Sequence, residues 1–284
     1  LDEYSAERPR FSIGEIHIFD WEEWAVYYGT ALDELHMPFN FGLLGIQWDA
    51  QTVRQHVDEL EAALPLGAWP NYVLGNHDDH RLASRVGMVQ ARVAAMLLLT
   101  LRGTPTIYYG EEIGMTNVDI PRQMQKDPAG LRQPGQERDL CRTPMQWSAN
   151  PNAGFAPEGT RELWLPLADD WRNTNVEAQI NDPAAMLNFY RGLLAMRKEF
   201  SALHQGNYTP LDGMPESCFV YLRQGAGQSL TVALNFTGVP QRLSMDGDGI
   251  ILLSTHLDRE GAVNLQSLNL RENEGVIIQM QNAK

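Results

Sequence analysis

Short apolar segments alternate with stretches of helical periodicity over roughly the first 200 residues of the chain. Because a strand followed by an amphipathic helix is the repeating unit of α/β folds, this alternation predicts four successive strand–helix units. The strands are expected at residues 11–16, 35–39, 72–74 and 106–109, and the helices at residues 21–31, 49–64, 90–101 and 182–200. The pattern therefore predicts an α/β unit over residues 1–200.

Two of the expected helices carry recognisable start signals. Val53 and Val57 fall on one face of the second helix, and Asp49 stands at the position of its N-cap. Asp182 directly precedes a proline at the start of the last helix, which is also typical of a cap.

Residues 111–181 contain no such alternation and are rich in Pro, Asn, Gln and Arg. A loop of this length is unusual unless it builds a site or a lid. After residue 201 the pattern consists of strands separated by turn sequences, which predicts an antiparallel β-sandwich over residues 201–284. Its strands are expected at residues 218–222, 230–235, 249–253, 263–270 and 276–280.

The composition limits which classes of binding partner and which cellular compartment are expected for this protein. The formal net charge of −14 argues against nucleic acid and anionic membranes, because both are bound through clustered Lys and Arg. The longest apolar run, near residues 94–101, is far shorter than the roughly 20 residues that span a bilayer. Two cysteines and no secretory signal favour a reducing cytoplasm, and no His or Cys spacing fits a metal site, so no metal or cofactor is expected.

Polar residues at the strand ends are the candidates for chemistry, because ligands of β/α folds bind there. Glu15 stands late in the first strand, and His77 and Asp78 follow the third. A carboxylic acid that protonates a glycosidic oxygen must stay protonated, and a neighbouring carboxylate such as Asp78 raises its pKa. Asp78 and His77 are then expected to bind sugar hydroxyls. The structural alternatives are an ordinary strand-end acid for Glu15 and a helix cap for Asp78.

Other conspicuous side chains are interpreted as structural. Glu111 and Glu112 are expected to be structural or to lie at the rim, and Arg81 and Arg85 to hold carboxylates or loop backbone. Four aromatic residues follow helical spacing and are expected to pack in the core. These are Trp21, Trp24, Tyr27 and Tyr28.

Four segments carry a resemblance to a known family. Gly75-Asn76-His77-Asp78-Asp79-His80-Arg81 resembles the fourth conserved motif of the α-amylase superfamily, glycoside hydrolase family 13. Residues 13–16, 103–112 and 138–147 resemble, in order, its acid/base motif, its eighth-strand motif and a signature of its α-glucosidase branch. The resemblance extends along nearly the whole chain and implies strands five to eight of a (β/α)8 barrel, followed by the β-domain.

The resemblance also implies individual roles. Glu15 matches the acid/base, Asp78 the stabiliser of the transition state, and His77 a binder of the glucose that is cleaved. Arg142 is expected at the entrance or aglycone side, and Phe41 as an aromatic wall. The implied activity is release of α-linked glucose from short oligosaccharides with retention of configuration.

One element of the family pattern has no match. The retaining mechanism needs two carboxylates roughly 5 to 5.5 Å apart, one attacking and one protonating. No Asp of this chain matches the nucleophile, and the chain opens on Leu1 with what resembles the end of a helix. We therefore expect a C-terminal half that is inactive alone, its open barrel edges covered by the N-terminal half or by a second copy.

Two other functions fit the same motifs. One is a transglycosylase or isomerase of the superfamily, such as a trehalose- or isomaltulose-forming enzyme. The other is a silent binding or partner subunit, like the amylase-like ectodomains of transporter heavy chains. The segment at residues 35–41 weakly favours a preference for α-1,4 linkages, but the sequence does not decide between α-1,4 and α-1,6.

Overall fold

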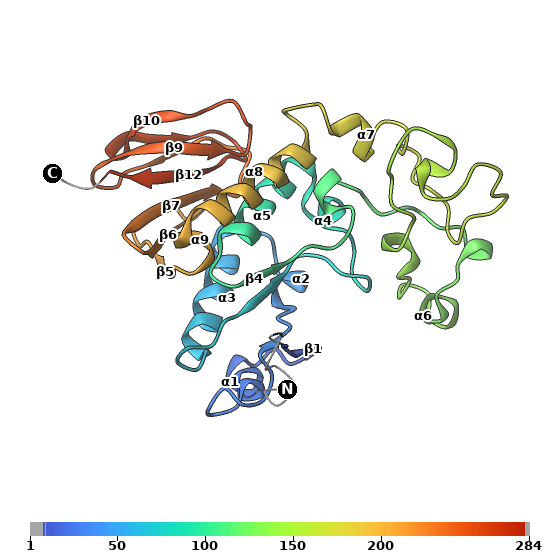
Figure 1. Ribbon diagram of the computed structural model, residues 1–284, viewed down its shortest axis with the longest axis horizontal. Coiled ribbons are helices and arrows are strands. Elements are labelled where there is room, and N and C mark those ends of the chain that lie inside the picture. Colours follow the sequence, from blue (N-terminus) through green and yellow to red (C-terminus); the bar gives the residue numbers. More distant parts are fainter. Residues whose placement is uncertain (1–7, 9, 282–284) are drawn as a thin grey trace.

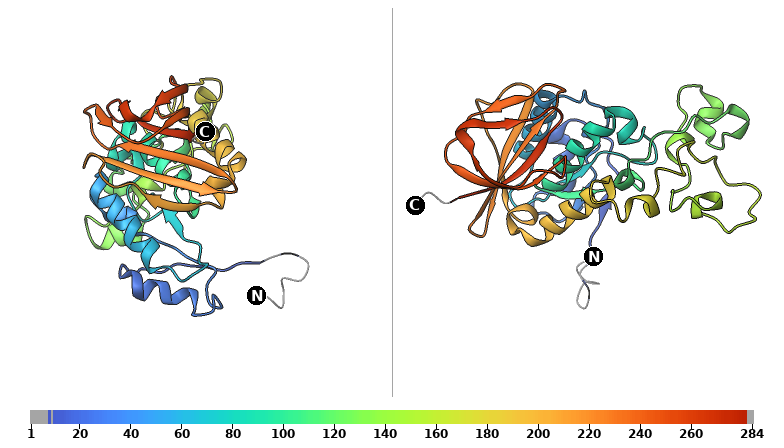
Figure 2. Two further views of the ribbon diagram at one scale, coloured as in Figure 1. Left: turned by 90° about the vertical axis from the view of Figure 1, so that its left-hand side faces the viewer. Right: turned by 90° about the horizontal axis from the view of Figure 1, so that it is seen from above.

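The computed structural model describes residues 8 and 10–281 of the chain. The helix end expected at residues 1–4 lies outside this part. Figure 1 shows three regions in a row: a β-sheet at one end, a layer of helices in the middle and the long loop region at the other end. The right view of Figure 2 shows the same order from above. Among the described residues, no helix has the length and apolar character needed to cross a bilayer.

The four strands of the α/β region form two separate parallel pairs. β1 (Ile13–Gly14) pairs with β2 (Met37–Pro38), and β3 (Asn71–Val73) pairs with β4 (Thr104–Thr106). Within the described residues β2 and β3 share no ladder. All four strands are at most three residues long, and the last ends before the Tyr108-Tyr109 pair that was expected inside it.

The helices of this region follow the apolar periodicity. Their bounds are α1 (Trp21–Ala25) with the 3-10 turn η2 (Val26–Tyr28), α2 (Gly42–Gly45), α3 (Ala50–Ala63), α4 (Leu82–Val86), α5 (Met88–Thr100) and α8 (Met186–Glu199). Asp49 caps α3 as predicted, because its Oδ1 accepts the Thr52 N–H at 2.9 Å.

The predicted start of α8 is wrong by several residues. The helix begins at Met186, and its N-cap Ala185 makes no side-chain cap bond. Asp182 instead accepts the Ala184 N–H at 2.9 Å, closing the turn before the helix. The Asp182 side chain therefore does bond a nearby backbone N–H, but this bond stabilises a turn and not the start of the helix.

The long loop has no strand within residues 111–181 and is built from short helical turns. These are η3 (Glu111–Ile113), η4 (Arg122–Met124), α6 (Pro128–Arg132), η5 (Asp139–Cys141), η6 (Pro151–Gly154) and α7 (Val176–Gln179).

The C-terminal region is a six-stranded antiparallel sheet, in the order β10-β9-β12-β7-β6-β5, faced by the two-stranded sheet β11-β8. Its strands are β5 (Asn207–Pro210), β6 (Cys218–Gly225), β7 (Gln228–Asn235), β8 (Gln241–Leu243), β9 (Asp248–Ser254), β10 (Gly261–Asn264), β11 (Leu268–Leu270) and β12 (Gly275–Met280). The sequence had not predicted β5 or β8. Helix α9 (Ser201–His204) stands where only strands were expected, and η7 (Leu265–Ser267) divides the strand expected at residues 263–270.

The large sheet and the helical layer share one core. Phe219 and Tyr221 of β6 are fully buried in the same apolar cluster as α5 and α8. The Tyr221 hydroxyl lies 2.5 Å from that of Thr100, and the buried Arg223 guanidinium donates to the Thr100 carbonyl. The other face of the sheet encloses a smaller cluster against β8 and β11. The sheet therefore supports the helices rather than standing apart.

Replacing Phe219 with Ala is expected to lower the free energy of unfolding by about 3–5 kcal/mol, because it leaves a cavity in this shared core. Denaturation followed by far-UV circular dichroism and by Trp fluorescence should show one common transition. Val239→Ala, at an exposed position, serves as the control. Two separate transitions, with only one of them shifted by the Phe219 variant, would contradict a shared core.

Candidate active site

The turn after β3 is fixed by its own sequence. Asn76 Oδ1 accepts the N–H groups of Asp78 and Asp79 at 2.8 and 2.9 Å. At Gly75 an added Cβ would lie 2.2 Å from Glu111 Oε1, so a side chain there would have to displace the buried Glu111 carboxylate. The Gly-Asn pair thereby sets the direction in which the Asp78 carboxylate leaves the backbone.

The Asp78 carboxylate is held by the long loop. Its Oδ1 accepts hydrogen bonds from Arg138 Nη1 at 2.9 Å and Arg142 Nη2 at 2.7 Å, while His77 Nε2 lies 3.6 Å away. Arg142 Nε also donates to the His77 carbonyl at 2.6 Å. Asp78 does not cap α4, whose N-cap is Arg81. The structure thus brings together three of the predicted site residues, Asp78, His77 and Arg142.

Arg138, to which the sequence assigned no role, is itself anchored. Its Nε and Nη2 donate to the buried Asp127 carboxylate at 2.8 and 2.7 Å, and the Arg138 guanidinium holds the pKa of Asp127 well below its usual range. Asp139 Oδ2 accepts the N–H groups of Lys126 and Asp127 at 2.5 and 2.8 Å. The Arg138-Asp139 pair in the signature segment was the available signal for this clamp.

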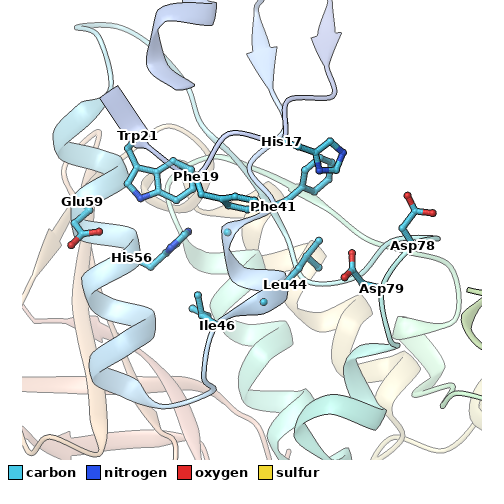
Figure 3. A pocket seen from close by; sticks show the side chains of 12 residues that line it. His17, Phe19, Trp21, Phe41, Leu44, Ile46, His56, Glu59, Asp78 and Asp79 are labelled. Atoms are coloured by element: carbon cyan, nitrogen blue, oxygen red, sulfur yellow. The ribbon is translucent and has the colours of Figure 1, made fainter. Parts of the chain in front are cut away.

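A cavity of about 660 Å³ opens beside Asp78 (Figure 3). Phe41, the predicted aromatic wall, lines it, with its ring stacked on His17 at 4.8 Å and on Phe39 at 5.4 Å. Asp78 lies on the same cavity wall as Asp79 and Leu44. The cavity therefore combines an aromatic face with carboxylates, which is the combination that a sugar ring needs.

Trp21 and His56 line the opposite part of the cavity, and the sequence had not placed them in the site. Of the four aromatic residues expected in the core, Trp24 and Tyr28 are buried, Tyr27 is exposed and Trp21 lines this cavity. Burial lowers the pKa of His56 to about 4, so its imidazole is neutral at neutral pH. Helical spacing does not distinguish a residue that packs in the core from one that lines a cavity, because both kinds of apolar helix face have the same periodicity.

Glu15 lies outside this cavity wall. Its carboxylate is exposed and lies 3.2 Å from His17 Nε2, and His17 in turn stacks on Phe41. No hydrogen bond or ion pair joins Glu15 to Asp78 in the described part of the chain. The described residues therefore show no contact between the two carboxylates that were expected to act as neighbours.

Comparison with known proteins identifies the family. The family described as "Alpha amylase, catalytic domain" matches residues 2–206, which is most of the chain. The protein belongs to the α-amylase family. Its match begins before β1 and ends just before β5, the first strand of the large sheet, so it includes the two parallel strand pairs and the long loop.

Relatives of this α-amylase family member include both enzymes and a transporter subunit. Maltase A1 of Drosophila melanogaster is 33% identical over 79% of this chain and 40% of its own length. The amino acid transporter heavy chain SLC3A1 of Rattus norvegicus is 32% identical over 98% of this chain and 41% of its own length. The chain therefore spans about two fifths of these curated relatives.

Solved structures agree with this assignment. The α-glucosyl transfer enzyme XgtA superposes with a TM-score of 0.87 at 32% identity, over 99% of this chain and 52% of that one. The trehalulose synthase MutB from Pseudomonas mesoacidophila MX-45 gives 0.84 at 27% identity, over 97% of this chain and 56% of that one. The fold of this family member is therefore shared with an α-glucosyl transfer enzyme and a trehalulose synthase.

The arginines near the turn hold backbone, which confirms their predicted role. Arg85 donates to the carbonyls of Leu44, His80 and Leu74, and Arg81 Nη1 donates to the Tyr109 carbonyl at 2.7 Å. These bonds tie the end of β3 to the end of β4 and to α2.

Glu111 also holds backbone near the end of β4, in agreement with its predicted structural role. Its Oε2 accepts the Tyr108 N–H at 3.2 Å, whereas its buried Oε1 has no hydrogen-bond partner. Burial raises the pKa of Glu111 to about 8, against the lowering effects of Arg85 and Arg81. The residue is therefore a neutral acid at neutral pH.

This raised pKa predicts a pH-dependent stability. The fold favours the neutral form of Glu111. The stability that this residue contributes is therefore fully present below its ordinary pKa of 4.5 and is lost as the pH rises to about 8. The slope is at most about 1.4 kcal/mol per pH unit. We expect Glu111→Gln to flatten the fall in unfolding free energy over this range, measured by urea denaturation at several pH values.

The exposed Glu158→Gln variant is the matched control and should follow the wild type. An unchanged pH profile in the Glu111 variant would show that its carboxyl ionises in the fold as it does in water.

Proposed function

We propose that this chain is part of a retaining α-glucosidase that releases α-linked glucose from short, neutral oligosaccharides. The observation that supports this most strongly is the Asp78 carboxylate, fixed by two arginines beside His77 on the wall of a sugar-sized cavity. In this proposal residues 1–200 are strands five to eight of a (β/α)8 barrel, which agrees with the parallel pairing of β1 with β2 and of β3 with β4.

The proposed chemistry proceeds in two steps. Glu15 gives its proton to the glycosidic oxygen as that bond to C1 breaks, and a carboxylate attacks C1 from the other face. In the second step Glu15, now ionised, takes a proton from water, whose oxygen displaces the attacking carboxylate. Asp78 and His77 hold the sugar hydroxyls as the ring flattens toward an oxocarbenium ion.

The attacking carboxylate is proposed to come from polypeptide that covers the open side of the sheet. Exposure alternates along residues 11–19, which places Phe11, Ile13 and Phe19 on the same open face as Glu15. Large apolar side chains on an open face indicate a covering partner. The N-terminal barrel half of the same protein fits this face best, and a second copy of the chain is the alternative.

Two alternatives rest on particular relatives. A transglycosylase or isomerase is favoured by the likeness to XgtA and MutB, and it differs only in whether a sugar or water accepts the glucosyl group. A silent partner subunit is favoured by the rat transporter heavy chain, which matches 98% of this chain. The presence of Glu15 and Asp78 together supports the enzyme.

The buried free thiols of Cys141 and Cys218 support a reducing compartment, and we propose the cytoplasm.

The sugar site can be tested by binding the iminosugar 1-deoxynojirimycin to the chain, measured by calorimetry. Asp78→Asn should weaken binding about ten- to hundredfold, because a charged hydrogen bond is worth about 1.5–3 kcal/mol. His77→Ala, at an exposed position, should also weaken it, whereas Glu59→Gln, a carboxylate on the same cavity, should not. Binding that survives both site variants would exclude this sugar site.

The chain alone is expected to show no turnover of p-nitrophenyl α-glucoside, because it contributes only the protonating carboxylate. The assay is release of p-nitrophenol, with Glu15→Gln as the background control. Turnover at the rate of complete α-glucosidases, lost in the Glu15 variant, would show that the chain supplies its own nucleophile.

A further inference from the structure

The turn after β3 is held at both of its ends by one arginine. Arg85 Nε donates to the His80 carbonyl at 3.1 Å, after the turn, and Arg85 Nη2 donates to the Leu74 carbonyl, before it. Within the turn, Glu111 Oε1 is so close to Gly75 that an added Cβ would come within 2.2 Å of it. The Glu111 carboxyl therefore lies directly against the turn.

The backbone around Arg142 is held by two neighbouring tyrosines. The Tyr108 hydroxyl donates to the carbonyl of the residue before Arg142 at 3.2 Å, and the Tyr109 hydroxyl donates to the carbonyl of the residue after it at 2.6 Å. The Tyr108 N–H in turn donates to Glu111 Oε2 at 3.2 Å. Glu111 therefore contacts both the turn after β3 and the strand end that holds Arg142.

The surroundings of Glu111 favour its uncharged form. The residue is buried, and the groups that face it are the guanidinium groups of Arg81 and Arg85 beside α4, the Glu112 carboxyl on its own helical turn and the Tyr190 hydroxyl of α8. Burial raises the pKa of Glu111 to about 8, whereas the two arginines lower it. Ionisation therefore falls within a pH range in which binding can be measured.

Ionisation of Glu111 changes which contacts suit its carboxyl. A buried carboxylate needs a cation or several hydrogen-bond donors, and Oε1 beside Gly75 has no partner among the described residues. The Nε and Nη2 atoms of Arg81 are also buried without a partner in this part of the chain. The charged carboxylate is therefore expected to turn from Gly75 toward Arg81, which removes support from the turn.

We infer that Glu111 is a positioning residue of the candidate active site, whose uncharged carboxyl holds the Asp78 turn and the Arg142 backbone in the arrangement that binds glucose. The inference rests on the proposed function and deepens it, because it gives the sugar site a control by pH. Affinity for glucose is complete while Glu111 is protonated and falls as this residue ionises.

The first test follows the turn itself by NMR while the pH is raised from about 6 to about 9. The amide resonances of Asp78 and Asp79, whose N–H groups donate to Asn76 Oδ1, should show a shift centred at about 8 in the wild type. Glu111→Gln replaces the acid with a neutral amide of nearly the same size and should abolish this shift, whereas the neighbouring Glu112→Gln should keep it. Absence of the shift in the wild-type chain, which requires no variant to observe, would overturn the inference.

The second test measures the dissociation constant of glucose, which carries no charge, by calorimetry at about pH 6 and about pH 9. Wild-type affinity is expected to fall about tenfold at the higher pH, the effect of weakening one charged hydrogen bond to the sugar. Glu111→Gln should bind glucose equally at both pH values, as tightly as the wild type does at the lower one. Glu112→Gln should follow the wild type.

The outcomes separate this inference from the proposed function. Glucose binding that depends on Asp78 but has the same affinity at both pH values would overturn the role of Glu111 and leave the proposed function standing. A fall of equal size in Glu111→Gln would assign the pH dependence to another group and would also overturn the inference. A turn that titrates with Glu111 in a chain that binds no glucose at either pH would support the positioning of the turn and overturn the proposed function.

Discussion

The Asp78 carboxylate, held between Arg138 and Arg142, is the contact on which the rest of the site depends. It joins the end of β3 to a loop of some seventy residues that has no sheet of its own. The ion pair between Arg138 and the buried Asp127 connects this contact to the rest of the loop. Because a charged carboxylate in a partly buried place must be paired, the loop and the turn stabilise each other. The same clamp leaves one edge of Asp78 on the cavity where a sugar can reach it.

Sequence reasoning succeeded where a local signal decided the outcome. The α3 helix with its Asp49 cap follows from apolar periodicity, and the Gly75-Asn76 turn follows from the need for a close approach and an Asx bond. The resemblance assigned His77 and Asp78 to the glucose site and Arg142 to its entrance or aglycone side, and in the structure Arg142 contacts both of the other residues.

Sequence reasoning failed where partners distant in the chain decided the outcome. Asp182 is a separate case, because its carboxylate accepts a local N–H, that of Ala184, in the turn before α8. No role was predicted for Arg138, whose partners Asp127 and Asp78 lie eleven and sixty residues away in the chain. Trp21 packs against the core as predicted, but it also lines the cavity, because periodicity shows which face is apolar and not whether a cavity adjoins it.

The account's central claim is that the cavity beside Asp78 holds one glucose ring and that Glu15 protonates the oxygen bound to its C1. A crystal structure of the chain with glucose would test this most directly. The account predicts that glucose lies against Phe41, with its hydroxyls within hydrogen-bond distance of Asp78 and His77. Glucose bound elsewhere, or a ring whose C1 faces away from the strand that carries Glu15, would contradict it.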